Sequence, residues 1–448
     1  MLDNLTNYFR EYKWTWFLAS LVLVLLPAVI NGYPFYFEDS AGYDGHGLFL
    51  PSTGQRFNLR SDIPGAISGI IYPLFGVWSL IIINGIIFSY IIGRFAQLFL
   101  PYTPLFVGLL MIALSGAPFY VSLLAPDIWI VFLGLCLAIL MARFSWIDFA
   151  IAVMASSGHG SGIYILAAVG LGFLLLGHNK ARFAFIAGAI CACSIVVVFS
   201  VDILINGAIS TERPAAATVA SKIINDVPEA LVDYCDQLPE EKVCKLKDRI
   251  DLLPPHSYDD AQYLWHAKLR DGPGTLSWQE FNALGQRLLG FVLLSRHAPA
   301  YLIESLYDYI NYFNPDRCLG FPGFVEYAAE DWTLEHYAKG EKNSLARAGV
   351  FTNDRFCMAI YAATFTIFML GSLVLIWTFL SRQQREYDVI LLLYLTAISN
   401  DIFFALLSGG YTRYHLRALP LLAVIVLIAF NQSQQKSYEK PPAQRSNR

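Results

Sequence analysis

The sequence predicts an all-α polytopic membrane protein with about ten transmembrane helices and a helical loop or cap domain on one side of the membrane. Of its 448 residues, 56% are hydrophobic and 15% are charged, whereas soluble domains carry about 25% charged residues. The mean hydropathy is +0.48, which excludes an ordinary soluble enzyme and a disordered chain. The formal net charge of -4 provides no basic surface for nucleic acid.

Apolar runs long enough for membrane helices recur along the chain. A helix that crosses a bilayer needs roughly 20 apolar residues. The predicted runs are 14–31, 77–99, 104–117, 127–142, 147–157 with 161–177, 183–205, 358–380, 388–408 and 415–430. We interpret 147–157 and 161–177 as two short helices on either side of a Gly/Ser break. The first run lacks a small-residue cleavage site, so we expect a mature span and not a signal peptide.

Basic residues predict the orientation of these spans. With a cytoplasmic N-terminus, every short basic loop lies on the cytoplasmic side, as the positive-inside rule requires. The chain is then predicted to divide into four parts. These are an N-terminal transmembrane core at 1–205, an outward-facing cap at 206–357, C-terminal transmembrane helices at 358–430 and a disordered cytoplasmic tail at 431–448. Outer loops at 32–76 and 118–127, the short turn at 409–414 and the Gly/Ser break at 156–162 are expected to face outward as well.

Ionisable residues gather at the predicted outer ends of the spans. They are Glu38, Asp39, Asp44, Asp127, His159, Arg413, His415 and Arg417. The acids could simply cap helices or face water, and the arginines could extend their side chains to the interface. However, positive charge on the outer side runs against the topology bias, so the arginines are expected to have an anionic partner.

This combination of residues suits transfer of a group from a lipid phosphate. A carboxylate can accept the proton of an attacking hydroxyl, and arginine can hold a phosphate through two parallel hydrogen bonds. Asp202 and Asp401 lie inside predicted spans, where they could pair with an outer arginine or line a hydrated cavity.

Two of the seven cysteines are expected to form a disulfide. Cys235 and Cys244 lie nine residues apart in the long outer loop, and the outer compartment permits disulfides. No C-x-x-C or zinc-finger spacing occurs, which argues against a structural zinc site.

Several short motifs resemble the GT-C superfamily of integral membrane glycosyltransferases. Asp39, Ser40 and Tyr43 follow the first apolar helix, as in the first outer loop of that superfamily. The segment from Arg60 to Gly65 (RSDIPG), the dipeptide Pro126-Asp127 and the Arg413-Tyr414 pair before Leu416 and Pro420 are similar as well. The resemblance covers about 1–205 and 358–430, and uncharacterised bacterial members are the most similar.

The resemblance implies a bacterial inner-membrane enzyme with its active site on the periplasmic face. It implies an inverting transfer of a hexose or pentose from a polyprenyl-phosphate donor to a glycan, lipid or protein acceptor, in cell-envelope polysaccharide synthesis. Asp39 would be the base, with Glu38 and Asp127 beside it. The donor phosphate would bind Arg413, Arg417, His159 and His415, and the substrates would contact Tyr43, Asp44 and Tyr414. No cofactor is required by the motifs, although Asp39 and Asp127 could ligate Mg²⁺ or Mn²⁺.

Three alternatives stay open. Arg296 and His297 in the long loop also fit an O-antigen ligase or polymerase-like enzyme. A transporter or flippase for an anionic lipid would place broken helices near the bilayer midplane in both halves of the chain, and only one Gly break, at 156–162, is present. The third alternative is a non-enzymatic subunit of an envelope polysaccharide system.

Overall fold

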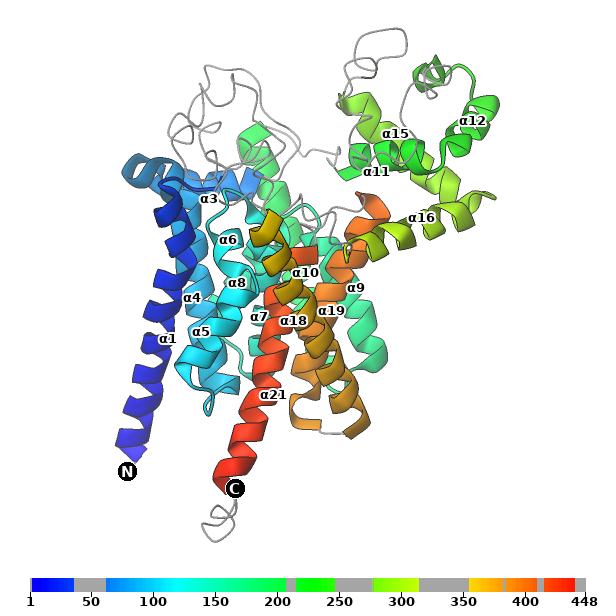
Figure 1. Cartoon of the computed structure of the whole chain (residues 1–448). Helices are drawn as coiled ribbons and strands as arrows, with labels where there is room; N and C mark the ends of the chain where they lie inside the picture. Colours follow the sequence, from blue (N-terminus) through cyan, green and yellow to red (C-terminus); the bar gives the residue numbers. More distant parts are fainter. Residues whose placement is uncertain are drawn as a thin grey trace.

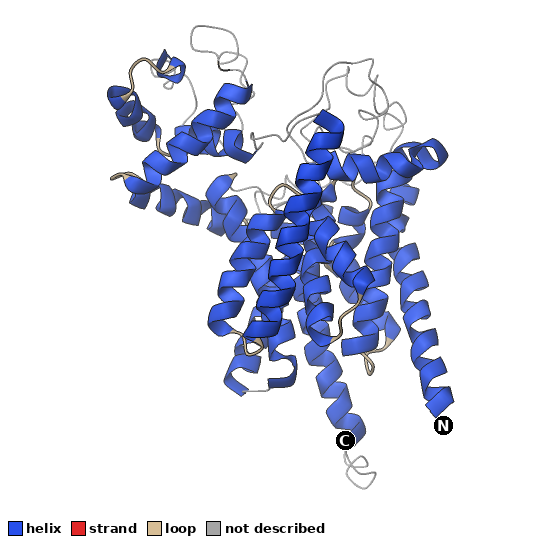
Figure 2. Ribbon diagram, turned by 180° about the vertical axis from the view of Figure 1, so that it is seen from behind, coloured by secondary structure: helices blue, strands red, loops and turns tan. Residues whose placement is uncertain are grey.

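The computed structural model describes residues 2–35, 62–206, 215–245, 276, 278–313, 354–381, 384–408 and 415–439. These parts of the chain form helices and no strand, which confirms the predicted all-α class (Figures 1 and 2). A bundle of helices carries a smaller group of helices at one end, and the first described helix begins and the last one ends at the other end of the bundle (Figure 1).

The first half of the bundle contains nine α-helices in the described residues. They are α1 (Leu2–Asn31), α3 (Asp62–Phe75), α4 (Ser79–Phe99), α5 (Leu105–Leu114), α6 (Ala117–Val121), α7 (Trp129–Ala142), α8 (Trp146–Gly158), α9 (Gly162–Leu176) and α10 (Lys180–Asn206). The second half adds α18 (Asp354–Ser381), α19 (Gln384–Leu407) and α21 (Leu419–Glu439). Helix α7 lies at the centre, with nearly all of its residues buried.

Five stretches of the described residues are long and apolar enough to cross a membrane. They are Lys13–Asn31, Ile63–Phe99, Lys180–Leu204, Ala362–Ser381 and Glu386–Leu407, and the pair α8 and α9 would be a sixth if it counts as one span. Several other apolar helices, such as α5, are shorter. The chain therefore has the composition and helix lengths of a membrane-embedded protein, while the count of ten spans stays a prediction.

The predicted single span at 104–117 is wrong in detail, because the helix is interrupted. Helix α5 ends at Leu114, and Gly116 adopts a left-handed backbone with φ of 79°. This conformation is easy for glycine and strained for other residues, so the chain turns there and restarts as α6. The predicted outer loop at 118–127 consequently contains most of α6 and the 3₁₀ turn Pro126–Ile128.

The predicted outer loop at 32–76 also contains a helix. Helix α3 occupies Asp62–Phe75, immediately before α4, and its Ile70 and Leu74 side chains are largely exposed. Apolar side chains exposed on a helix next to membrane spans are expected to face lipid and not water.

The predicted break at 156–162 separates two helices that bend sharply. The axes of α8 and α9 differ by 115° across this break. The bend brings His159, at the end of α8, into the cap end of the bundle.

The predicted tail at 431–448 is wrong in its first part. Helix α21 continues to Glu439, and Asn431 and Gln432 are buried. The Asn431 side chain accepts a hydrogen bond from the backbone N–H of Tyr102 at 2.8 Å, and Gln432 bonds to Glu386 of α19. The polar side chains in this segment suggested a tail in water, but here they are buried and form hydrogen bonds with other parts of the protein.

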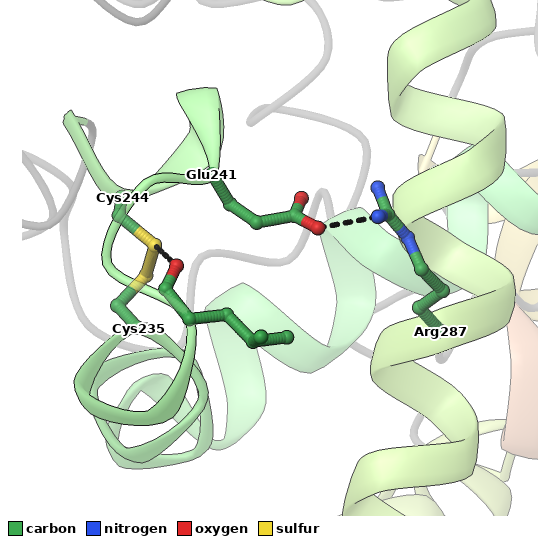
Figure 3. Close-up of a disulfide and its surroundings, with 5 residues drawn as sticks. Cys235, Glu241, Cys244 and Arg287 are labelled. Atoms are coloured by element: carbon green, nitrogen blue, oxygen red, sulfur yellow. Dashed lines mark hydrogen bonds and ion pairs between the residues drawn. A yellow bond between two sulfur atoms is a disulfide. The ribbon is translucent and has the colours of Figure 1, made fainter.

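The described residues of the predicted cap form a second, smaller hydrophobic core. They comprise α11 (Ala215–Asp226), α12 (Pro228–Gln237), α15 (Trp278–Leu294) and α16 (Ala298–Asn311). Cys235 and Cys244 are joined in a disulfide, and beside it Glu241 pairs with Arg287 of α15 (Figure 3). The boundaries 206 and 357 themselves stay predictions.

Helix α16 attaches this group of helices to the bundle. The Tyr301 hydroxyl donates a hydrogen bond to the carbonyl of Leu406 in α19, and Tyr312 is buried in the core of the bundle. The buried Lys222 of α11 pairs with Asp226 and with Asp308 of α16. Buried amines are stable only when paired in this way, so Lys222 fixes α11 to α16.

Candidate functional site

Four segments that are distant in sequence meet at the cap end of the bundle. The 3₁₀ turn before α7 carries Asp127, the break between α8 and α9 carries His159, the second half of α19 carries Asn400 and Asp401, and the turn before α21 carries Arg417. A proline in the first helical position opens the Asp127 turn, and the preceding Ala125 is extended, as expected for a residue before proline.

Arg417 is the centre of this cluster and is fully buried. One terminal nitrogen, Nη1, donates to Asp127 Oδ1 at 2.6 Å. The Nε and Nη2 groups both donate to Asn400 Oδ1, at 3.0 and 2.8 Å. The guanidinium also lies over the Phe404 ring, 4.1 Å from its centre. A guanidinium is always charged in proteins and needs such partners when water is excluded.

His159 accepts a hydrogen bond from the same guanidinium. Its Nε2 lies 3.1 Å from Arg417 Nη1, and because arginine has no acceptor, the imidazole nitrogen must be the unprotonated one. The other ring nitrogen, Nδ1, lies 2.7 Å from the Ser161 hydroxyl and accepts from the backbone N–H of Ser161 at 3.3 Å. In the described arrangement His159 Nε2 is therefore an acceptor for Arg417, whereas the sequence suggested that His159 is an additional donor for phosphate.

His415 and Asp401 form a second buried pair. The Nδ1 atom of His415 lies 2.7 Å from Asp401 Oδ2, and the amide of Asn400 donates to Asp401 Oδ1 at 3.1 Å. Asn400 thus joins the two pairs, because its oxygen accepts from Arg417 and its nitrogen donates to Asp401. With neutral imidazoles, the two carboxylates and one guanidinium give the cluster a formal charge of -1.

Aromatic rings enclose the His415 imidazole. Tyr312 stacks on it at a ring distance of 6.2 Å with an interplanar angle of 8°, and Phe313 and Phe368 approach at 4.8 and 5.4 Å. Tyr312 and Phe313 directly follow α16. The helix that attaches the cap therefore also encloses one side of the site.

The first outer loop begins close to the Asp127 turn. The backbone N–H of Phe35 donates to the carbonyl of Ser122 at 3.0 Å, and Leu124 N–H donates back to Phe35 at 2.9 Å. These two bonds form an isolated parallel bridge. Below it, the Trp129 indole donates to Asn84 at 2.8 Å, which fixes the start of α7.

The structure thus brings together Asp127, His159 and Arg417 directly, and adds His415 through Asn400 and Asp401. Six other predicted site residues lie outside the described residues: Glu38, Asp39, Tyr43, Asp44, Arg413 and Tyr414. Arg417 lies in the turn before α21. Asp202 is buried near the end of α10.

Asn400 was missed by the sequence analysis. Its one available signal was the polar run Ser399-Asn400-Asp401 inside an apolar helix, since polar residues within spans are costly and usually have a role.

The surroundings of Asp127 do not fit a divalent cation. Arg417 already occupies Oδ1 of this carboxylate, and a guanidinium would repel a metal ion placed beside it. No group of three or more His, Cys, Asp or Glu side chains in the described part of the chain is arranged to hold a metal.

Arg296 and His297 face Asp233 within the cap. Arg296 Nη2 and His297 Nε2 lie 2.7 and 2.8 Å from the same oxygen of Asp233. The hydrogen bond with His297, together with Arg296, holds the pKa of the Asp233 carboxyl below its ordinary value, although partial desolvation opposes this.

Comparisons with protein-family models, with curated proteins and with solved structures find no match for this chain. The chemistry of the site must therefore be argued from its own residues.

Proposed function

We propose that this protein is a membrane glycosyltransferase that moves a sugar from a polyprenyl-phosphate donor to an acceptor at the outer face of the membrane. The main support is the fully buried Arg417, held by Asp127, Asn400 and His159 at the cap end of the bundle. Such a costly charged group inside a membrane protein is by default a functional element. The motifs shared with the GT-C superfamily add the sugar and the lipid carrier to this interpretation.

In the proposed reaction, Asp39 accepts the proton of the acceptor hydroxyl. The hydroxyl oxygen forms a bond to the anomeric carbon from the face opposite the phosphate, and the carbon–oxygen bond to the phosphate breaks. The electron pair leaves with the polyprenyl phosphate, and the configuration inverts. Arg413 would stabilise this departing phosphate through its paired N–H groups.

Arg417 has a different part in this proposal. Its donors are directed to Asp127, Asn400 and His159, so it would act by positioning the Asp127 turn and the His159 break around the substrates. Asp127 would hold this arrangement as the counter-charge of Arg417, and Glu38, Tyr43, Asp44 and Tyr414 would contact the sugar or the acceptor.

The test is an assay of the purified protein in lipid vesicles with a radiolabelled polyprenyl-phosphate sugar and an added glycan acceptor. The wild-type protein should release polyprenyl phosphate in proportion to the glycan product. Asp39→Asn should lower turnover by about 10²–10⁴-fold, while Glu229→Gln, which alters an exposed carboxylate of α12, should leave it unchanged. A folded Asp39→Asn protein with full turnover would refute the assignment of the base.

Donor binding tests the phosphate site separately. Arg413→Lys should weaken binding almost as much as Arg413→Ala, because an ammonium group cannot form the paired hydrogen bonds of a guanidinium. Unchanged donor binding in Arg413→Ala would show that the donor phosphate is bound by other residues.

A transporter or flippase for an anionic lipid is the second candidate, and the bend of 115° between α8 and α9 favours it. Broken helices with polar residues at the break are typical of transporter binding sites. A transporter would move a labelled lipid phosphate between the leaflets of the vesicle without cleaving it. Transbilayer movement that persists in Asp39→Asn, with no product formed by the wild type, would favour this function.

A further inference from the structure

Helix α16 has an exposed face that is entirely apolar. The side chains of Leu302, Ile303, Leu306, Tyr307 and Ile310 are each more than half exposed. Pro299 and Ala300 are also exposed, and the charged residues Glu304 and Asp308 are only partly so. A helix that faces water places polar residues on its exposed side, so the exposed side of α16 is not suited to water.

The neighbouring helices of the cap behave as water-facing helices should. Helix α12 exposes Glu229, Asp236 and Gln237, and α15 exposes Gln286 and Arg287. The last residues of α15 differ, because the apolar side chains of Leu293 and Leu294 are exposed where the chain turns toward α16. The apolar surface of the cap is therefore concentrated on α16 and the adjacent end of α15.

The direction of this apolar face follows from what covers the opposite face. Tyr301, Ser305 and Asp308 repeat every three or four residues and so share one side of α16. Asp308 pairs with Lys222 of α11, and Tyr301 lies in the core that α11 shares. In Figure 1, α11 lies above α16, on the side of α16 that is away from the two ends of the chain trace. The exposed face is on the other side of α16, so it points in the direction in which the bundle extends away from the cap.

Helix α16 also has the position of a helix at a membrane surface. It extends sideways from the cap end of the bundle, at a large angle to the long helices (Figures 1 and 2). Its 14 residues span about 21 Å. Amphipathic helices in the plane of a membrane bury their apolar face about 5–10 Å into the boundary between headgroups and acyl chains.

We propose that α16 is an interfacial helix, with Leu302, Ile303, Leu306, Tyr307 and Ile310 inserted into the outer surface of the bilayer. The occupant of this surface is lipid, because α16 joins the bundle at Leu406 of α19, a helix that is long and apolar enough to cross a membrane. Tyr307 suits this depth, since amphipathic aromatic rings are enriched at membrane interfaces. The cap would then rest on the membrane through α16 while α11, α12 and the first part of α15 remain in water.

The test uses the full-length protein in phosphatidylcholine vesicles that contain a phospholipid with a photoactivatable diazirine on its acyl chain. After irradiation, mass spectrometry should find lipid adducts on peptides from α16 and from the exposed side of α1. Peptides from α12 should carry none. The proposal is wrong if α16 carries no adducts while α1 does.

A matched pair of variants sharpens the result. Leu306→Glu places a charge in the centre of the apolar face and should abolish or strongly reduce adducts on α16, with those on α1 unchanged. Gln286→Glu adds the same charge on the water-facing side of α15 and should leave both unchanged. If Leu306→Glu does not fold, Leu306→Ser should give a smaller decrease in the same direction. Adducts on α16 that no substitution at Leu306 alters would overturn the proposal.

Discussion

Arg417 carries a positive charge in a place from which water is excluded, so its neighbours decide whether the arrangement is stable. The carboxylate of Asp127 balances the charge, and the amide oxygen of Asn400 accepts from two of its nitrogens. The charge of Arg417 could be predicted to need an anionic partner from its outer position alone. Asp127, 290 residues away in sequence, could not be identified as that partner, since only the fold brings the two together.

The cost of removing Arg417 should depend on Asp127. Arg417→Gln should lower the free energy of unfolding by about 3–5 kcal/mol, because it leaves a buried carboxylate uncompensated. In an Asp127→Asn background the same change should cost clearly less. The measurement is thermal or denaturant unfolding of the four proteins in detergent.

The exposed pair of Arg287 and Glu241 provides the control. About half of the Arg287 side chain is exposed (51%), and such surface pairs contribute about 0–1 kcal/mol. Arg287→Gln should therefore change stability little. Equal costs of Arg417→Gln with and without Asp127 would contradict the coupling.

Two glycines at the α8–α9 break should differ sharply in their tolerance of a methyl group. A Cβ atom added to Gly158 would lie 1.9 Å from the ring of Trp129, whereas one added to Gly160 would meet nothing within 4 Å. Gly158→Ala should cost about 1–3 kcal/mol through overpacking and displace the Trp129 indole from Asn84. Gly160→Ala should be near neutral, as unfolding and tryptophan fluorescence can show. Equal effects of the two substitutions would argue against this packing.

At the scale of elements, hydropathy was a good guide wherever a helix is uniformly apolar. Helix α7 and helix α10 begin and end close to the predicted limits. The errors occur where a local or distant interaction overrides hydropathy. Gly116 interrupts one apolar run by its left-handed backbone. In the last helix, the hydrogen bond from Tyr102, in a loop distant in sequence, holds Asn431 inside the structure where hydropathy predicts a tail.

The contact between α12 and the start of α16 should weaken in acid. The pKa of Asp233 is lowered chiefly by His297 and also by Arg296, so its ionised form is favoured in the folded state. A lowered folded-state pKa gives stabilisation that is present above the unfolded-state value, about 3.9, and is lost as the pH falls through the folded-state pKa.

Asp233→Asn should therefore lower stability by a constant amount at neutral pH and by a decreasing amount below about pH 4. Unfolding of the wild type and the variant across this range measures the difference, and Glu229→Gln is the control on the same helix. A difference that stays constant down to the lowest pH would show that Asp233 is not the group that titrates.

For the whole molecule, the separation of the cap from the chain ends predicts their accessibility. The disulfide of Cys235 and Cys244 lies in the cap, and the start of α1 and the end of α21 lie at the opposite end of the bundle (Figure 1). Reporter groups attached at Met1 and Arg448 should respond from one side of the membrane. The two cysteines should react from the other side, and only after reduction. Labelling of the reduced cysteines from the side of the chain ends would reverse the predicted topology.

The start of α1 and the end of α21 lie at the same end of the bundle (Figure 1), and if the bundle spans a bilayer as predicted, this limits how often the chain crosses it. A chain that begins and ends on the same side must cross an even number of times, and the five long apolar stretches give an odd number. The shorter or bent helices must then supply an odd number of additional crossings. The pair α8 and α9 adds one crossing if it is a broken span and none if it is a re-entrant loop. The assignment of the bend at His159 therefore decides whether α5, α7 and α21 together add an even or an odd number of crossings.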